Sequence, residues 1–233
     1  MRKLIIPTIL VFMLCLGCSN AAKDSELNQA NPIPLPFMPV ENVQEIHEVR
    51  QIIEEEIVRE QAVSEGTIVL YAKRDDSEYL YGAYKTGDSI FELGVISGRF
   101  DNVDEFLSID ELELFDRHLV RIKGLFGANA PIQNYYSIEG GLIVPFLRID
   151  TGHATEIDLD GNGTVEIISS HGAAIQTYIY KWENEQFSMA DVNEALGATS
   201  VYLNPDEQLE AFYHTTQTSQ LISYDAGVLK PIH

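Results

Sequence analysis

Cysteine is scarce in this chain. The 233 residues contain only Cys15 and Cys18, and both precede Ser19. No intramolecular disulfide can therefore stabilise the remainder of the chain, and no thiol is available there as a nucleophile. Stability must come from a hydrophobic core, for which a chain with 45% hydrophobic residues is long enough.

Basic residues are also few. Lys and Arg number 15 against 36 Asp and Glu, which gives a formal net charge of −21. A surface of this charge repels nucleic-acid phosphates and anionic lipid headgroups, so we expect no nucleic-acid partner and no electrostatic attachment to a membrane. Any membrane attachment must be covalent.

Signatures of covalent catalysis are missing as well. The chain has no HExxH or GxSxG motif and no glycine-rich phosphate loop. Ser170 and His171 are adjacent and could act as nucleophile and base, but a histidine in a turn is the simpler interpretation. Trp182 alternates with Tyr178 and Tyr180 and could form a sugar-binding platform, although cross-strand packing explains the same pattern. The sequence favours a non-catalytic role.

Residues 1–17 are predicted to be a signal peptide that is removed. Arg2 and Lys3 precede an apolar run from Leu4 to Leu14, and this run is too short to span a bilayer as a mature helix. The chain is therefore expected to be exported.

The end of the predicted signal peptide contains a motif around Cys18. The run Leu14-Cys15-Leu16-Gly17-Cys18-Ser19 resembles the signal of bacterial lipoproteins, in which a Cys after a small residue is lipidated and becomes the new N-terminus. The resemblance implies a palmitate-type lipid on Cys18 and anchoring at the extracytoplasmic side of the cell membrane. The alternative is an ordinary secretory signal with a coincidental Cys.

Two segments are predicted between Cys18 and the main domain. Residues 18–40 are predicted to form an extended, semi-rigid spacer behind the lipid anchor, because prolines recur at Pro32, Pro34, Pro36 and Pro39. Residues 41–66 are predicted to form an amphipathic helix that packs on the domain, with Asn42 as N-cap. The apolar positions of this helix recur at helical spacing and are Ile46, Val49, Ile53 and Ile57.

Residues 67–233 are predicted to form a β-rich domain of antiparallel hairpins, because short runs of Val, Ile, Tyr and Phe alternate with turn residues. A hairpin turn recurs at Gly87, Gly140, Asn184 and Gly227, at intervals of 53, 44 and 43 residues. These intervals are close to the length of a propeller blade, so a small four-bladed propeller is one arrangement, and a helix-decorated β-sheet domain is the other. The predicted fold class is mainly β with one N-terminal helix.

The acidic run over residues 158–166 is the one stretch whose spacing predicts a specific ligand. The residues with ligand oxygens at loop positions 1, 3, 5, 7 and 9 are Asp158, Asp160, Asn162, Thr164 and Glu166. Thr164, at position 7, would bind through its backbone carbonyl. Gly163 supplies the sharp turn, and three carboxylates this close repel one another unless a cation lies between them. The pattern predicts a calcium site; the alternative is an Asx-rich turn that holds itself by side-chain hydrogen bonds.

This loop differs from an EF-hand, because its position 12 is Ser169 and the flanking residues have the composition of strands. It resembles the calcium loop of the FG-GAP and VCBS repeat families, a D-x-D-G-[ND]-G-x-x-[DE] run before a short apolar strand, over residues 157–187. The resemblance implies that the same loop residues bind calcium. The chain carries one copy, whereas those families usually carry several in tandem.

Three functions are compatible with these features. The expected one is a membrane-anchored extracytoplasmic lipoprotein whose calcium-stabilised, β-rich domain binds or scaffolds a protein or glycan partner. One alternative is an extracytoplasmic hydrolase or carbohydrate-processing enzyme whose site is assembled from residues distant in sequence. The other is a module whose partner binding depends on calcium occupancy, since extracellular modules bind calcium with dissociation constants of about 10⁻⁴ to 10⁻³ M.

Overall fold

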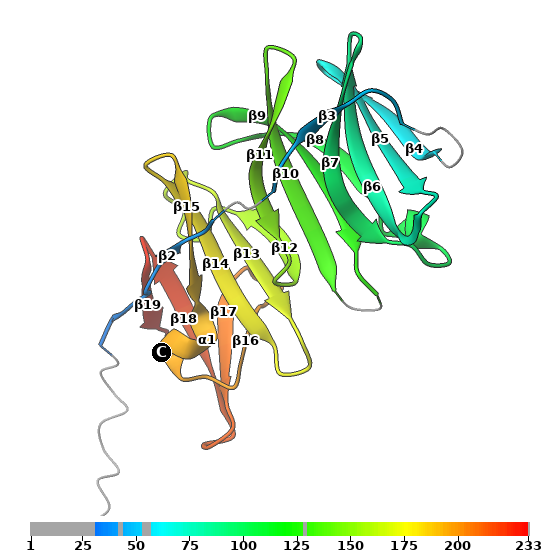
Figure 1. Cartoon of the computed structure of the whole chain (residues 1–233). Helices are drawn as coiled ribbons and strands as arrows, with labels where there is room; N and C mark the ends of the chain where they lie inside the picture. The colour runs from blue at the N-terminus through cyan, green and yellow to red at the C-terminus, as the bar shows by residue number, and fades with distance from the viewer. Residues whose placement is uncertain (1–30, 42–43, 53–56, 128–129, 233) are drawn as a thin grey trace, which may run out of the picture. The chain divides into compact units, whose positions relative to one another are not determined.

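The strands from β4 onward form four successive antiparallel meanders, with four strands in each (Figure 1). The computed structural model describes residues 31–41, 44–52, 57–127 and 130–232. Within it, the chain from Pro32 to His233 forms one compact unit. The predicted signal peptide and Cys18 lie outside the described residues. Because antiparallel sheets make up most of the described structure, the predicted mainly β fold class is confirmed.

Each meander builds one sheet, and we number the sheets I to IV in chain order. Sheet I contains β4 (Ile57–Val63), β5 (Gly66–Lys73), β6 (Asp76–Thr86) and β7 (Ser89–Gly98). Sheet II contains β8 (Ser108–Leu114), β9 (Arg117–Leu125), β10 (Pro131–Glu139) and β11 (Leu142–Ile149). Sheet III contains β12 (His153–Ile157), β13 (Glu166–His171), β14 (Gln176–Glu183) and β15 (Gln186–Asp191). The short helix α1 (Val192–Leu196) then leads to sheet IV, which contains β16 (Ser200–Leu203), β17 (Leu209–Tyr213), β18 (Thr218–Asp225) and β19 (Val228–Pro231).

The recurring turns predicted from the sequence occupy the same place in each of the four meanders. Gly87, Gly140, Asn184 and Gly227 each lie in the turn between the third and fourth strands of a meander. These turns contain two residues, and most of those residues have positive φ, such as Asn184 at 52° and Glu185 at 61°. Such turns match the right-handed twist of the strands that they join. The spacing of 53, 44 and 43 residues is therefore the length of one meander with its connection.

Three hydrophobic clusters join the sheets in chain order. The first lies between sheets I and II, the second between sheets II and III, and the third between sheets III and IV. In β10 every residue except Glu139 is buried, because Tyr136 packs toward sheet I while Tyr135 packs toward sheet III. No cluster of the described residues joins sheet I to sheet IV, so a closed propeller is not seen.

The helix predicted over 41–66 is not supported. His47–Val49 forms strand β3, which pairs with β7, and Ile57–Val63 forms β4, which pairs with β5. Residues 42–43 and 53–56 of this prediction lie outside the described residues. The reason lies in tertiary structure. The edge strand of a meander offers backbone hydrogen bonds to β-branched residues, and these outweigh the small intrinsic helix propensity of the segment.

The prolines of the predicted spacer also belong in part to the sheets. Ile33–Pro34 forms β1 on β19, and Met38–Pro39 forms β2 on β15. We call residues 32–41 and 44–49 the N-terminal strap, because they add an edge strand to sheets IV, III and I in turn (Figure 1). Proline is tolerated there because an edge strand does not need every N–H for the ladder. Residues 32–40 are therefore part of the folded unit.

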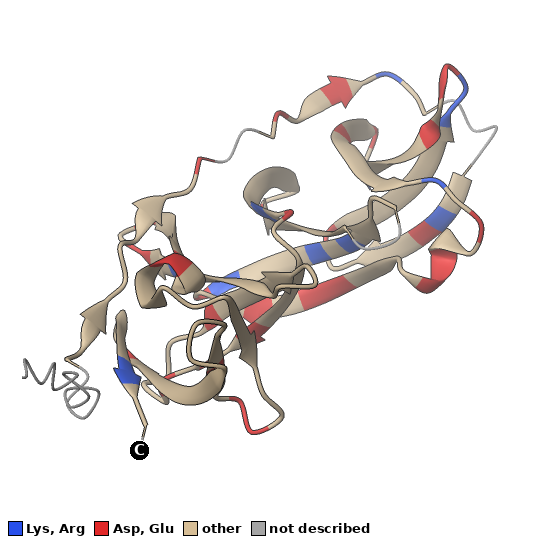
Figure 2. Ribbon diagram, turned by 90° about the horizontal axis from the view of Figure 1, so that it is seen from below, with Lys and Arg blue, Asp and Glu red and all other residues tan. Residues whose placement is uncertain are grey.

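Charge is distributed over the whole unit. Asp and Glu lie along strands and turns of every sheet, while Lys and Arg are confined to fewer positions (Figure 2). Of the described helices, none is long and apolar enough to cross a membrane.

Candidate metal site

The acidic loop connects β12 to β13, and strand register explains why its ends meet. Ile157, the last residue of β12, pairs with Glu166, the first residue of β13. Asp158 therefore leaves the sheet directly beside the strand that carries Glu166. Two glycines with positive φ, Gly161 at 72° and Gly163 at 87°, let the chain reverse between them.

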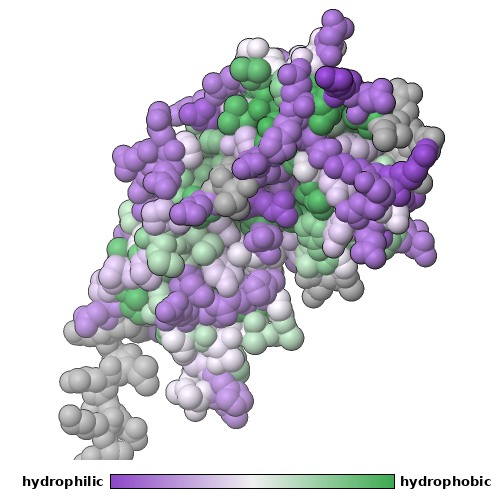
Figure 3. Space-filling view, in the orientation of Figure 1, coloured by the Kyte–Doolittle hydropathy of each residue, from purple (hydrophilic) through white to green (hydrophobic). Residues whose placement is uncertain are grey.

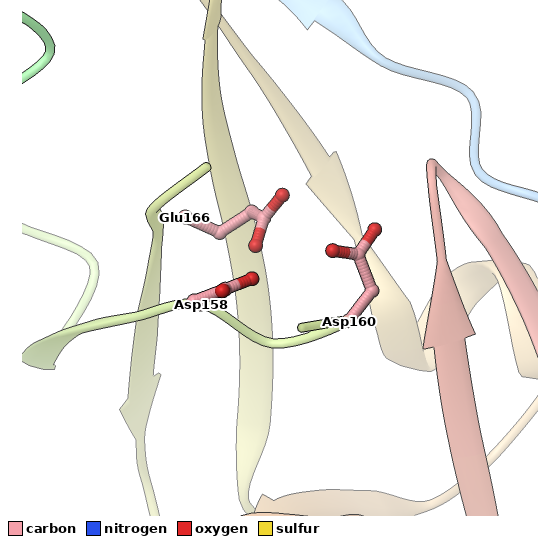
Figure 4. A group of neighbouring side chains, drawn as sticks. All are labelled: Asp158, Asp160 and Glu166. Carbon is pink, nitrogen blue, oxygen red and sulfur yellow. The ribbon is translucent and has the colours of Figure 1, made fainter. Parts of the chain in front are cut away.

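Three carboxylates converge in this loop. Asp158, Asp160 and Glu166 each place one carboxylate oxygen within 4.8 Å of the others, a geometry able to hold a metal ion. Figure 4 shows their side chains pointing toward a common space. Asp158 is exposed, Asp160 is half-buried and Glu166 is buried, with 4% of its surface exposed. Oxygen ligands of this kind suit hard divalent cations.

The electrostatics of the cluster favour a positive charge at its centre. Burial, together with the negative charges of Asp160 and Asp158, raises the pKa of Glu166 to about 7, against the opposing effect of the Leu159 amide. The Leu159 N–H donates to Glu166 Oε2 over 3.1 Å. A bound cation would oppose these effects by favouring the ionised carboxylate.

Asn162 and Thr164, the other two predicted ligand residues, make hydrogen bonds within the loop. The Asn162 N–H donates to Asp158 Oδ1 over 3.0 Å, and the Thr164 N–H donates to Asn162 Oδ1 over 2.6 Å. The Gly163 N–H donates to Asp158 Oδ2 over 2.9 Å. These are the hydrogen bonds expected of an Asx-rich turn, and they hold the Asp158 carboxylate in place. The structure thus groups the three carboxylates among the five predicted ligand residues.

The loop also contacts sheet IV, which the sequence did not predict. The Ala226 N–H, in the β18–β19 turn, donates to Asp160 Oδ2 over 2.8 Å. Leu159 packs into the cluster between sheets III and IV. Burial raises the pKa of Tyr224, and the nearby Glu166 and Asp160 add to that shift. The carboxylates therefore lie at the junction of two sheets. The sequence could not predict this contact, because Asp160 and Ala226 are 66 residues apart in the chain.

The histidine and aromatic candidates make hydrogen-bond or packing contacts within sheet III. Ser170 Oγ lies 2.8 Å from Thr177 Oγ1, and the His171 ring lies beside that of Tyr178, with centroids 6.1 Å apart. Both residues line the same hollow, but among the described residues no hydrogen bond joins Ser170 to His171. This hollow of about 410 Å³ is also lined by His153 and Tyr202 among others. Trp182 packs with its cross-strand partner Phe187, at a ring-centroid distance of 4.8 Å, which supports the packing interpretation.

Comparison of the chain with protein-family models, with curated proteins and with solved structures finds no match.

Proposed function

We propose that this chain is a lipid-anchored extracytoplasmic lipoprotein whose β-rich domain binds or scaffolds a partner and is stabilised by calcium in the loop 158–166. The observation that carries the metal part is the convergence of three carboxylates within 4.8 Å, one of them almost fully buried. Calcium fits oxygen ligands supplied by a short loop, and the resemblance of this loop to FG-GAP and VCBS loops favours calcium over other cations.

Calcium would act on the junction of sheets III and IV. Asp158 and Glu166 belong to sheet III and its loop, while Asp160 accepts a hydrogen bond from the β18–β19 turn of sheet IV. A cation bound by all three carboxylates would remove their mutual repulsion and hold that turn in place. Stability of the C-terminal sheet should therefore depend on calcium.

The test is a pair of melting curves, one in about 5 mM calcium and one in chelator. At ten times the dissociation constant, binding stabilises the folded state by about 1.4 kcal/mol, which raises Tm by roughly 3 to 6 °C for a domain of this size. Asp160→Asn should abolish that rise. We choose asparagine because it removes the charge but keeps an oxygen that can accept from the Ala226 N–H.

Asp206→Asn provides a matched control, since Asp206 is an exposed aspartate in the β16–β17 connection. It should keep the full calcium-dependent rise. A wild-type Tm that is identical in calcium and chelator would reduce the loop to an Asx turn and refute calcium stabilisation.

The anchor is tested separately through Cys18. Cells expressing the full chain with labelled palmitate should yield a labelled protein in the membrane fraction, and Cys18→Ser should lose both the label and the membrane association. Soluble, unlabelled wild-type protein outside the cell would instead indicate an ordinary secretory signal.

A further inference from the structure

A groove lies where three hairpin ends of sheets II and III come together. We call it the Trp182 groove, and its hollow of about 550 Å³ is lined by Phe115, Asp116, Arg117, Glu139, Trp182 and Glu185. A second hollow of about 210 Å³ shares Trp182 and Glu185 and is bounded on its other side by Pro145 and Phe146. Figure 1 places the β8–β9, β10–β11 and β14–β15 turns at the same end of their sheets.

The walls of the groove are a packed aromatic cluster. The Phe146 ring centroid lies 4.7 Å from that of Trp182 and 5.1 Å from that of Phe187, and the Phe115 centroid lies 5.3 Å from that of Phe187. Phe115 has a φ of 57°, a conformation that bulky residues rarely adopt and that costs energy. Rings held this firmly lose little entropy when a partner docks on them.

One arginine completes the surface. The Arg117 guanidinium lies 5.6 Å from the Phe146 ring centroid and 5.9 Å from that of Trp182, and it pairs with Glu139 over 2.7 Å. Tryptophan and arginine are the residues that most often dominate binding energy at protein interfaces. Because Glu139 neutralises Arg117, the charge of the groove is set by its acidic rim, where Asp116 and Glu185 are exposed.

A free strand edge borders the groove. β11 is the edge strand of sheet II, and no described strand pairs with its outer side, whereas the N-terminal strap covers the fourth strand of each other sheet. Leu142 and Val144 on β11 are 60% and 50% exposed. They pair with Glu139 and Ser137, which line the groove, so they lie on the groove face of the sheet. Figure 3 shows hydrophobic surface at the top of its view, where Figure 1 places the β10–β11 hairpin.

The fold itself shows what such an edge accepts. Ile33–Pro34 and Met38–Pro39 are short, extended, apolar segments, and each adds to the fourth strand of its sheet. In such a segment the apolar side chains on one face meet the groove and the alternate side chains point to the other face, where basic residues would be attracted by the net negative charge of the chain. A second copy of this chain is a poor occupant, because it would bring an equal rim and a net charge of −21 against the first.

We propose that the β11 edge and the Trp182 groove bind an extended segment of a partner protein in which apolar and basic residues alternate. The segment adds a strand beside Leu142 and Val144, and its apolar side chains on one face contact Trp182. This inference names the partner class for the binding role proposed above and rests on that role. Its test involves no calcium, so the two proposals can fail separately.

The probe is a fluorescein-labelled peptide of alternating lysine and isoleucine, titrated with the full chain and followed by fluorescence polarisation. One control peptide has the same composition but places all lysines before all isoleucines. The other control peptide alternates glutamate and isoleucine. We expect the alternating basic peptide to bind at least about tenfold more tightly than either control. Hydrogen exchange of the Ile143 amide should slow in its presence, because Ile143 forms a non-hydrogen-bonded pair with Ile138 and its N–H points to the edge that the added strand pairs.

Val144→Lys should weaken binding of the basic peptide about tenfold, since it replaces an apolar contact by a like charge. Met38→Lys is the matched control, because Met38 is 65% exposed on another edge strand, and it should leave binding unchanged within about twofold. Both positions are exposed, so neither variant disturbs the core.

Three results would overturn the proposal. One is equal binding of the alternating and block peptides, which would reduce the effect to net charge. Another is equal behaviour of Val144→Lys and Met38→Lys. The third is a wild-type dimer in sedimentation that Val144→Lys converts to a monomer, which would make a second copy the occupant.

Discussion

Arg121→Ala is expected to lower the free energy of unfolding by about 3 kcal/mol, because it leaves the largely buried Glu156 carboxylate without its cation. Arg121 on β9 pairs with Asp110 on β8, with Nη2 and Oδ2 2.9 Å apart, and with Glu156 on β12 of the next sheet. Its side chain is 13% exposed and that of Glu156 is 16% exposed. The Tyr135 hydroxyl also donates to Glu156. This network joins sheets II and III.

Lys85→Ala serves as the control. Lys85 pairs with Glu60 over 3.0 Å within sheet I, at side chains that are 31% and 47% exposed, so its loss should cost at most about 1 kcal/mol. Urea unfolding at pH 7 measures both variants. Replacing the pair together, as Arg121→Met with Glu156→Leu, should recover much of the loss because no buried charge is then left unpaired. Equal costs for Arg121→Ala and Lys85→Ala would contradict a buried network.

The same network predicts a pH dependence. Burial opposes ionisation of Glu156, but hydrogen bonds from Tyr135 and Arg121 outweigh it and lower the pKa of this carboxyl. The pKa of Asp110 is lowered by Arg121 and Ser108 against the same opposition from burial. A carboxyl with a lowered folded-state pKa stabilises the fold above its unfolded pKa of about 4, and that stability is lost as pH falls through the folded value. The difference between wild type and Arg121→Ala should therefore be full at pH 7 and shrink below about pH 4.

Leu35→Ala is expected to cost about 2 to 5 kcal/mol, the range for removing a buried leucine side chain. Leu35 is 7% exposed and packs in the cluster between sheets III and IV, and its N–H donates to Gly227 O over 2.8 Å. A residue in a spacer would tolerate the change without loss. Denaturant unfolding of the full chain decides between these two roles.

Met38→Ala is the control for this experiment, since Met38 is 65% exposed on the same N-terminal strap. It should change the free energy of unfolding by no more than about 0.5 kcal/mol. A Leu35→Ala variant as stable as Met38→Ala would mean that the strap adds no stability to the sheets.

If Leu35 has the expected effect, the strap links the proposed anchor to the domain mechanically. Residues 32–40 then belong to the domain, and the proposed lipid on Cys18 is joined to it through the residues before Pro32. The metal loop lies close to this link, because Ala226, whose N–H binds Asp160, precedes Gly227, whose carbonyl accepts from Leu35. Calcium binding at the loop would thus stabilise the turn on which the strap is fastened.

The sequence by itself determined the features that depend on near neighbours. Alternating Val, Ile, Tyr and Phe residues with turn residues between them specify antiparallel hairpins, because side chains of a strand alternate between two faces. The turns at Gly87, Gly140, Asn184 and Gly227 are determined locally, since each needs residues that tolerate positive φ. The carboxylates of Asp158, Asp160 and Glu166 meet because they share one nine-residue turn between paired strands.

Tertiary structure alone decided the rest. Residues 41–66 carry a helical stripe and residues 32–40 carry prolines, yet both supply edge strands, because open meander edges offer backbone hydrogen bonds that no local pattern reveals. The pairing of Arg121 with Glu156 and of Asp160 with Ala226 joins different sheets, as does the Trp182 groove. Such contacts form only when packed sheets bring distant residues together, so the spacing of those residues in the chain does not predict them.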